Sequence, residues 1–152
     1  MSGQHTSAVT ARRRARELVL QGLYERQVGR SADDAIAAGL TESPGHAKAD
    51  AEYFRELWSG VCDEYDALLR AVEPNVDRRL KDVAPIERGL LAIGTWELTH
   101  RLDIPYRVVI DEAVELAKAY GGTDGHKFVN GILDKLVPRL RAAEMRGPSR
   151  DE

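Results

Sequence analysis

The sequence predicts an all-α protein, a compact bundle of about six to seven helices. Apolar residues recur at the 3.6-residue spacing of an amphipathic helix in successive segments, and no segment alternates as a half-buried strand does. Prolines and glycines fall between these segments, where helices are expected to end. A chain of 152 residues can bury roughly 70% of the surface that it exposes when unfolded. We therefore expect one domain with a substantial core.

The first predicted helix follows a short arm. Residues 1–9 lack periodicity, which predicts a flexible arm, and Thr10 suits the N-cap position. The helix is predicted to run from Thr10 to about Arg26. Its narrow apolar stripe consists of Ala11, Ala15, Leu18, Val19, Gly22 and Leu23.

Two dissimilar segments come next. Residues 29–48 are rich in glycine, serine and proline, which indicates a short helix and then a loop. Residues 49–72 carry the strongest helical stripe of the chain, and the sequence predicts one core helix there. That stripe consists of Phe54, Leu57, Trp58, Val61, Tyr65, Leu68, Leu69 and Val72.

Prolines and glycines delimit the remaining predicted helices. Pro74 ends the core helix, a shorter helix bearing Val76 and Leu80 follows, and Pro85 suits the first turn of the next helix. Another helix follows residues 103–105.

The end of that helix and the last predicted helix are marked by small and polar residues. Gly121 and Gly122 suit the helix end, and Thr123 or Asp124 can cap the last helix. Residues 144–152 are predicted to form a flexible tail.

The composition excludes several protein classes. Hydrophobic residues make up 43% and charged residues 31%, which is typical of a folded globular protein. One cysteine, Cys62, excludes a disulfide framework, and one cysteine with four scattered histidines builds no zinc site. No segment resembles a signal peptide or a membrane-spanning helix. We therefore expect a cytoplasmic protein with no membrane association.

Basic charge is concentrated at the amino-terminal end. The net charge is −3, but residues 1–30 hold six basic and two acidic side chains. The helix start carries Arg12, Arg13, Arg14 and Arg16, where acidic side chains would suit the helix dipole better. Helical spacing puts Arg12 and Arg16 beside the apolar stripe and Arg13 on a different, exposed face. These arginines are either a solvated helix start or contacts for nucleic-acid phosphates.

The start of the last predicted helix carries a second candidate cluster. Phe128 lies about 100° from the centre of the buried stripe and is expected to be partly buried, whereas Lys127 faces nearly away from the core. An aromatic ring and a lysine at a helix N-terminus can hold a stacked base and a phosphate. Phe128 otherwise fills a gap against a neighbouring helix, and Asn130 either reads a base edge or bonds the backbone.

No enzyme signature is present in the sequence. Residues 122–127 lack the full spacing of a phosphate-binding loop, and Ser59 falls inside a helix rather than at a nucleophile elbow. Glu97 falls on an apolar helix face, where an internally paired carboxylate is a structural feature. We expect no catalytic residue, no metal and no cofactor.

Several motifs resemble one known family. They are the ARRRARE run at 11–17 with Leu23 and Tyr24, YFREL at 53–57, Glu87 with the stretch 90–98, DIPY at 103–106, DEAVELAK at 111–118 and HKFVNGILD at 126–134. Together they resemble the NusB family of transcription antitermination factors over about residues 8–138. The resemblance implies two three-helix halves around a shared core, with residues 10–143 as the single helical RNA-binding domain.

The resemblance also implies partners. NusB-like proteins pair with NusE, a small-subunit ribosomal protein, and the heterodimer binds boxA-type single-stranded RNA in ribosomal RNA operon leaders. Bound there with other Nus factors, they promote processive elongation by RNA polymerase. Free relatives are monomers or homodimers.

The same resemblance implies roles for individual residues. It places RNA contacts at Arg12, Arg13, Arg16, Asp124, Lys127, Phe128 and Asn130. It places contacts with NusE at Tyr24 and Glu87.

The chain departs from the family pattern in places, and two other functions stay open. Ala92 stands where a basic residue is common, Trp96 replaces a usual tyrosine, and residues 27–50 match poorly. One alternative is a purely protein–protein adaptor with solvated arginines. The other is a stand-alone relative of the RNA-binding domain of ribosomal RNA cytosine methyltransferases.

Overall fold

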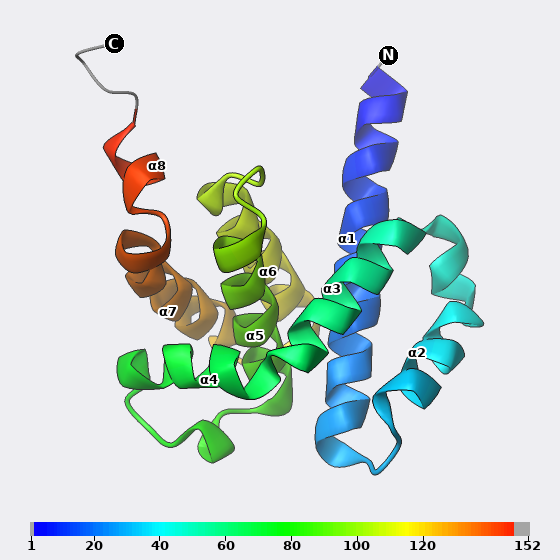
Figure 1. Ribbon diagram of the computed structural model, residues 1–152, viewed down its shortest axis with the longest axis horizontal. Helices are drawn as coiled ribbons and strands as arrows, with labels where there is room; N and C mark the ends of the chain where they lie inside the picture. The colour runs from blue at the N-terminus through cyan, green and yellow to red at the C-terminus, as the bar shows by residue number, and fades with distance from the viewer. Residues whose placement is uncertain (1, 148–152) are drawn as a thin grey trace. The chain divides into compact units, whose positions relative to one another are not determined.

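The structure is a computed structural model that describes the backbone of residues 2–147 and the side chains of residues 8–147. Eight α-helices and three short 3-10 helices, with no strand, make up the regular structure of this range (Figure 1). The predicted all-α class is therefore confirmed. The chain divides into two compact units, Met1–Glu64 and Tyr65–Glu152.

Each unit has its own set of elements. The first unit contains α1 (Ser2–Val28), α2 (Asp33–Thr41), the 3-10 helix η1 (Pro44–Lys48) and α3 (Ala51–Asp63). The second unit contains α4 (Tyr65–Val72), η2 (Glu73–Asn75), η3 (Leu80–Asp82), α5 (Pro85–His100), α6 (Tyr106–Tyr120), α7 (Gly125–Leu140) and α8 (Ala142–Arg146).

In the first unit, α1 packs against α2 and α3 through its small-residue stripe. Leu23 on α1 and Leu57 on α3 are fully buried. At Gly22 the helices approach so closely that an added Cβ would lie 2.5 Å from Trp58 Cζ3. The start of α3 is tied to α1 because the backbone N–H of Asp50 donates to the carbonyl oxygen of Ala11 at 2.9 Å. The predicted stripe of the first helix thus forms part of the core.

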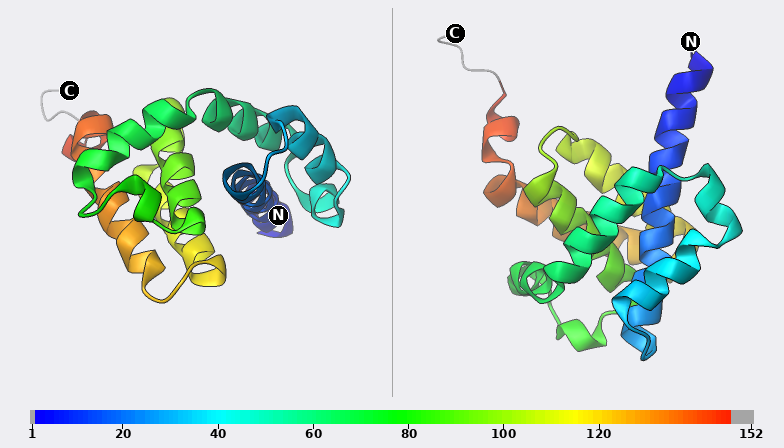
Figure 2. Two further views of the ribbon diagram at one scale, coloured as in Figure 1. Left: turned by 90° about the horizontal axis from the view of Figure 1, so that it is seen from below. Right: turned by 45° about the vertical axis from the view of Figure 1, so that its right-hand side comes forward.

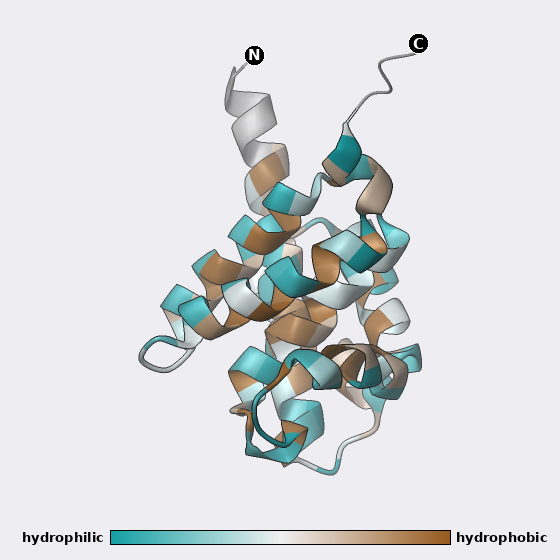
Figure 3. Ribbon diagram, turned by 90° about the vertical axis from the view of Figure 1, so that its left-hand side faces the viewer, coloured by the Kyte–Doolittle hydropathy of each residue, from teal (hydrophilic) through white to brown (hydrophobic). Residues whose placement is uncertain are grey.

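In the second unit, α5 is the central helix and packs against α4, α6 and α7 (Figure 2). Residues 89–98 are buried without interruption, and Pro85 occupies the first helical turn as predicted. On the outer helices, apolar and polar residues lie on different sides, as the hydropathy colouring in Figure 3 shows. The core of this unit therefore surrounds α5.

The predicted core helix at 49–72 is wrong in one respect. It is two helices, because the backbone leaves helical geometry at Glu64, where φ is −110° and ψ is 13°. Neither Glu64 nor Tyr65 is a proline or glycine, so the sequence carries no local sign of the break. The stripe continues across it, since Val61 and Leu68 are both buried on their separate helices. Tertiary packing therefore overrides a continuous helical pattern here.

The short helix predicted after Pro74 is also wrong. Val76 lies between η2 and η3, and Leu80 begins the three-residue η3. Both side chains are only half-buried, and Val83 is the buried residue of this stretch. A segment with so few buried apolar residues has too little packing to support a regular helix.

The helices extend beyond the predicted limits of the domain at 10 and 143. α1 begins at Ser2 rather than near Thr10, and α8 continues to Arg146. Met1 and residues 148–152 of the predicted arm and tail lie outside the described residues.

Candidate nucleic-acid interface

The arginines of α1 meet an aromatic ring at the start of α3. The guanidinium carbon of Arg12 lies 4.5 Å from the ring centroid of Tyr53, and that of Arg16 lies 5.7 Å from it. Tyr53 is itself held in place, because its backbone N–H donates to the side chain of the N-cap residue Asp50 at 3.0 Å. Cation–π contacts of this kind orient a guanidinium without consuming its hydrogen-bond donors.

The arginines differ in exposure. Arg13 is exposed and Arg12 is half-buried, so both side chains reach the protein surface. Arg16 is only 3% exposed, so it is covered by neighbouring groups rather than projecting from α1 into solvent. Helical spacing had placed Arg16 beside the stripe, but its near-complete burial depends on the neighbouring helix.

Tyr24 lies two turns further along α1 and is 44% exposed. Its neighbour Arg26 is held by Asp33 of α2, since the Nε of Arg26 donates to Oδ1 of Asp33 at 2.8 Å. This part of α1 therefore presents an aromatic side chain on a helix that is braced by α2.

In the second unit, the remaining predicted RNA-contacting residues lie at the start of α7, where Asp124 and Phe128 line one cavity and Lys127 and Asn130 do not. Lys127 and Asn130 are exposed, and Phe128 is half-buried. The Nζ of Lys127 lies 3.4 Å from Oδ1 of Asp124. Asp124 itself has a left-handed backbone, with φ of 62°, and its side chain does not cap α7. The predicted partial burial of Phe128 is thus observed, and of the two predicted cap residues, Thr123 and Asp124, it is Asp124 that occupies the N-cap position, without a capping hydrogen bond from its side chain.

Glu87 connects α5 to the loop before α7. It is 5% exposed, and its Oε1 accepts a hydrogen bond from the backbone N–H of Gly122 at 3.0 Å. An added Cβ at either Gly121 or Gly125 would overlap that same Oε1. The two glycines therefore make room for the carboxylate, and the carboxylate holds the loop that leads into α7.

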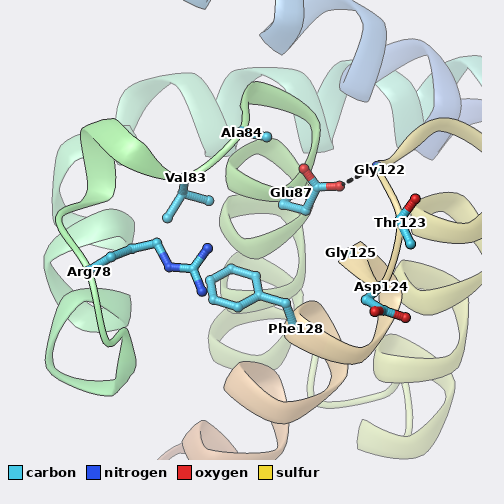
Figure 4. A pocket seen from close by; sticks show the side chains of 9 residues that line it. All are labelled: Arg78, Val83, Ala84, Glu87, Gly122, Thr123, Asp124, Gly125 and Phe128. Atoms are coloured by element: carbon cyan, nitrogen blue, oxygen red, sulfur yellow. Dashed lines mark hydrogen bonds between the residues drawn. The ribbon is translucent and has the colours of Figure 1, made fainter.

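A cavity of about 300 Å³ lies between the start of α5 and this loop (Figure 4). Phe128 and Glu87 line it together with Arg78, whose guanidinium carbon lies 4.8 Å from the centroid of the Phe128 ring. Arg78 was not singled out from the sequence. The basic pair Arg78-Arg79 after Pro74 is a weak signal, and only the folded chain brings one member of it to Phe128.

Other kinds of site find no support among the described residues. No group of three or more metal-ligating side chains occurs within residues 8–147. No helix in the described range is long and apolar enough to cross a membrane. Cys62 is buried as predicted, and burial above all raises the pKa of its thiol to about 12, with the nearby Asp33 adding to the shift. A thiol with that pKa stays protonated near neutral pH and is a poor nucleophile.

Comparison with known proteins gives one consistent family. The model of the NusB family matches residues 13–138. The chain is 49% identical over 136 residues to transcription antitermination protein NusB of Cupriavidus pinatubonensis, an alignment that covers 90% of this chain and 81% of the relative. It is 50% identical over 135 residues to the protein of the same name from Marinobacter nauticus, covering 89% of this chain and 85% of the relative.

A solved structure agrees with these sequence matches. The structure of T. maritima NusB superposes on this chain with a TM-score of 0.74 at 28% sequence identity. The alignment covers 88% of this chain and 96% of that one.

Proposed function

Because this chain belongs to the NusB family, whose curated relatives are transcription antitermination proteins and not enzymes, we propose that it binds boxA-type single-stranded RNA of ribosomal RNA operon leaders as a heterodimer with NusE. In that complex, with other Nus factors, it promotes processive elongation and ribosomal RNA synthesis. The observation that carries the RNA-binding part is the set of side chains around Phe128. A half-buried ring, an exposed lysine and a cavity occur together at one helix start.

In the second unit, Phe128 stacks on an unpaired base and Lys127 contacts a phosphate. Single-stranded RNA is held in this manner because every base has an aromatic face and every phosphate a negative charge. Asn130 is exposed about one helical turn after Lys127 and reads a base edge, while Asp124 keeps Lys127 oriented through their contact at 3.4 Å.

In the first unit, Arg12 and Arg13 contact RNA phosphates. The exposure of Arg13 and the contact of Arg12 with Tyr53 support this role, because an oriented guanidinium loses less freedom on binding. Arg16 has a different part in the proposal. Since it is buried, it packs on Tyr53 and acts on RNA binding through the ring that orients Arg12.

Tyr24 and Glu87 are proposed to serve the contact with NusE in different ways. The exposed ring of Tyr24 supports a direct contact. Glu87 bonds the backbone of its own loop and is almost covered, so its effect on NusE depends on the shape of the surface that it maintains.

Fluorescence anisotropy with labelled RNA tests the proposal. The chain mixed with NusE is expected to bind a boxA RNA more tightly than a scrambled RNA of the same composition. Equal affinity for both RNAs would refute sequence-specific binding, and no measurable binding to either RNA would leave the protein–protein adaptor as the better explanation.

Two substitutions test the proposed contacts within that assay. Phe128→Ala should weaken binding by roughly 1 to 3 kcal/mol, while Phe128→Tyr keeps the ring and most of the affinity. Arg13→Ala should lower the slope of log affinity against log salt by about 0.7, the value for one lost phosphate contact on a single strand. Arg30→Ala, which removes another exposed charge of the first unit, is the matched control and should leave the slope nearly unchanged.

A further inference from the structure

Arg78 covers the aromatic residue of the proposed RNA site. Its guanidinium carbon lies 4.8 Å from the centroid of the Phe128 ring, and both side chains face the cavity at the start of α7 (Figure 4). Arg78 comes from the irregular segment between η2 and η3, so no helix sets the direction of its side chain. Two contacts of the side chain itself, with Phe128 and with Asp77, place it at the site.

Asp77 supplies the second of those contacts. The Nε of Arg78 donates to Oδ1 of Asp77 at 3.0 Å, and the two side chains are 50% and 79% exposed. The pKa of Asp77 is lowered, first by this hydrogen bond, then by the charge of Arg78, with a smaller effect from Lys135. Asp77 is thus ionised near neutral pH and occupies a donor of Arg78 in the free protein.

An exposed ion pair of this kind is easily exchanged for a stronger one. A pair between exposed side chains changes an equilibrium constant by roughly fivefold or less. A phosphate is a better partner for a guanidinium than a carboxylate that uses one oxygen, because it accepts two parallel N–H bonds. Because the guanidinium lies 4.8 Å from the Phe128 ring, a nucleotide stacked on that ring would carry such a phosphate close to Arg78.

We propose that Arg78 is an RNA-contacting residue whose guanidinium leaves Asp77 to bind the phosphate of the nucleotide that stacks on Phe128. Asp77 is then a competing anion that lowers RNA affinity. The inference rests on the proposed function, since it assigns a further residue to the same RNA site. The inference predicts that Arg78 raises RNA affinity and Asp77 lowers it. An ion pair with a purely structural role would not have these opposite effects.

The neighbouring pair Arg79 and Asp82 provides matched controls. The Nε of Arg79 donates to Oδ2 of Asp82 at 3.1 Å in the same segment, and Arg79 is not among the residues that line the cavity. Arg78→Gln and Arg79→Gln remove the same charge one residue apart. Asp77→Asn and Asp82→Asn remove the matching carboxylates. All four side chains are exposed, so the substitutions are not expected to disturb folding.

RNA affinity and its salt dependence are measured for the four variants mixed with NusE and labelled boxA RNA. Arg78→Gln should weaken binding by about fivefold or more and lower the salt slope by about 0.7, whereas Arg79→Gln should change affinity by less than about twofold. Asp77→Asn should tighten binding by roughly twofold to fivefold, and Asp82→Asn should not. The tightening should disappear when Asp77→Asn is combined with Arg78→Gln.

The outcomes separate this inference from the proposed function. If Arg78→Gln behaves like Arg79→Gln while Phe128→Ala still weakens binding, Arg78 makes no RNA contact and the inference is overturned, but the RNA site stands. Weaker binding by Asp77→Asn would equally overturn it, since a competing anion cannot support binding. If the wild-type chain shows no preference for boxA RNA, both the proposed function and this inference fall.

Discussion

Replacing Arg141 with methionine tests the strongest polar network of the second unit. Arg141 is 3% exposed and follows the end of α7, where its guanidinium reaches the carboxyl end of α5. It donates to the carbonyl oxygens of Leu98 at 2.8 Å, Ile104 at 2.9 Å, Arg101 at 2.9 Å and Glu97 at 3.2 Å. The last carbonyls of a helix lack intrahelical partners, so Arg141 caps α5 from another element.

The magnitude of the effect follows from these bonds. A hydrogen bond that involves a charged group contributes about 1.5 to 3 kcal/mol, but four bonds from one guanidinium are not additive because water and small shifts recover part of the loss. Removing this guanidinium leaves several buried carbonyl oxygens without their donor, at about 1 to 3 kcal/mol for each unsatisfied group, and after partial relaxation we expect Arg141→Met to cost about 3 to 5 kcal/mol in all. For a chain of this size the melting temperature should fall by roughly 6 to 20 °C.

Urea denaturation followed by circular dichroism measures this free energy of unfolding. Arg139→Met is the matched control, because Arg139 is an exposed arginine of the same helix and its loss should change stability by less than about 0.5 kcal/mol. Glu144→Gln should cost less than Arg141→Met but more than Arg139→Met, since Glu144 is partly exposed, pairs with the buried Arg141 and accepts a hydrogen bond from the backbone N–H of Tyr106. A loss of less than about 1 kcal/mol in Arg141→Met would refute the capping role.

Two further predictions concern a glycine and the cysteine. Gly125→Ala should destabilise the protein by about 1 to 3 kcal/mol, because the added Cβ would overlap Glu87 Oε1. Gly131→Ala is the control on an open part of α7, and it should stabilise the protein by about 0.5 to 1 kcal/mol because alanine favours a helix over glycine. Combining Gly125→Ala with Glu87→Ala should recover part of the loss in urea denaturation, and full additivity would argue against the overlap. Because the pKa of Cys62 rises from 9.0 to about 12 on folding, the folded state retains its thiol proton above pH 9 and stability should fall between pH 9 and 12. The fall should be smaller in Cys62→Ala, and rapid reaction of the native thiol with a disulfide reagent at pH 8 would contradict the raised pKa.

Helical periodicity identified the packing faces well because it reports on each segment by itself. The stripe of α1 is buried from Ala15 to Leu23, and that of α7 is buried at Val129 and Leu133. Pro85 begins α5 because its missing N–H costs nothing in a first turn. The same local pattern could not reveal the end of α3 at Asp63, where the apolar stripe continues but the backbone leaves helical geometry at Glu64.

The candidate site was predicted less completely than the fold. Helical geometry alone predicted correctly that Phe128 is partly buried and that Lys127 is exposed. Arg78 was missed because nothing within its own segment points to Phe128. Glu87 was expected to face a partner, and its bond to Gly122 emerged only from the folded loop.

The sequence by itself determined the all-helical class, the packing faces of the main helices, the boundaries set by Pro85 and by Gly121 and Gly122, and the family motifs, because these depend on spacing within short stretches. Tertiary structure alone decided the burial of Arg16 and the contact of Arg78 with Phe128. It also decided the packing of the Glu87 carboxylate against Gly121 and Gly125. Each of these depends on which helix or loop from elsewhere in the chain packs nearby. A side chain's exposure and partners are set by that packing, whereas periodicity describes only the helix to which the side chain belongs.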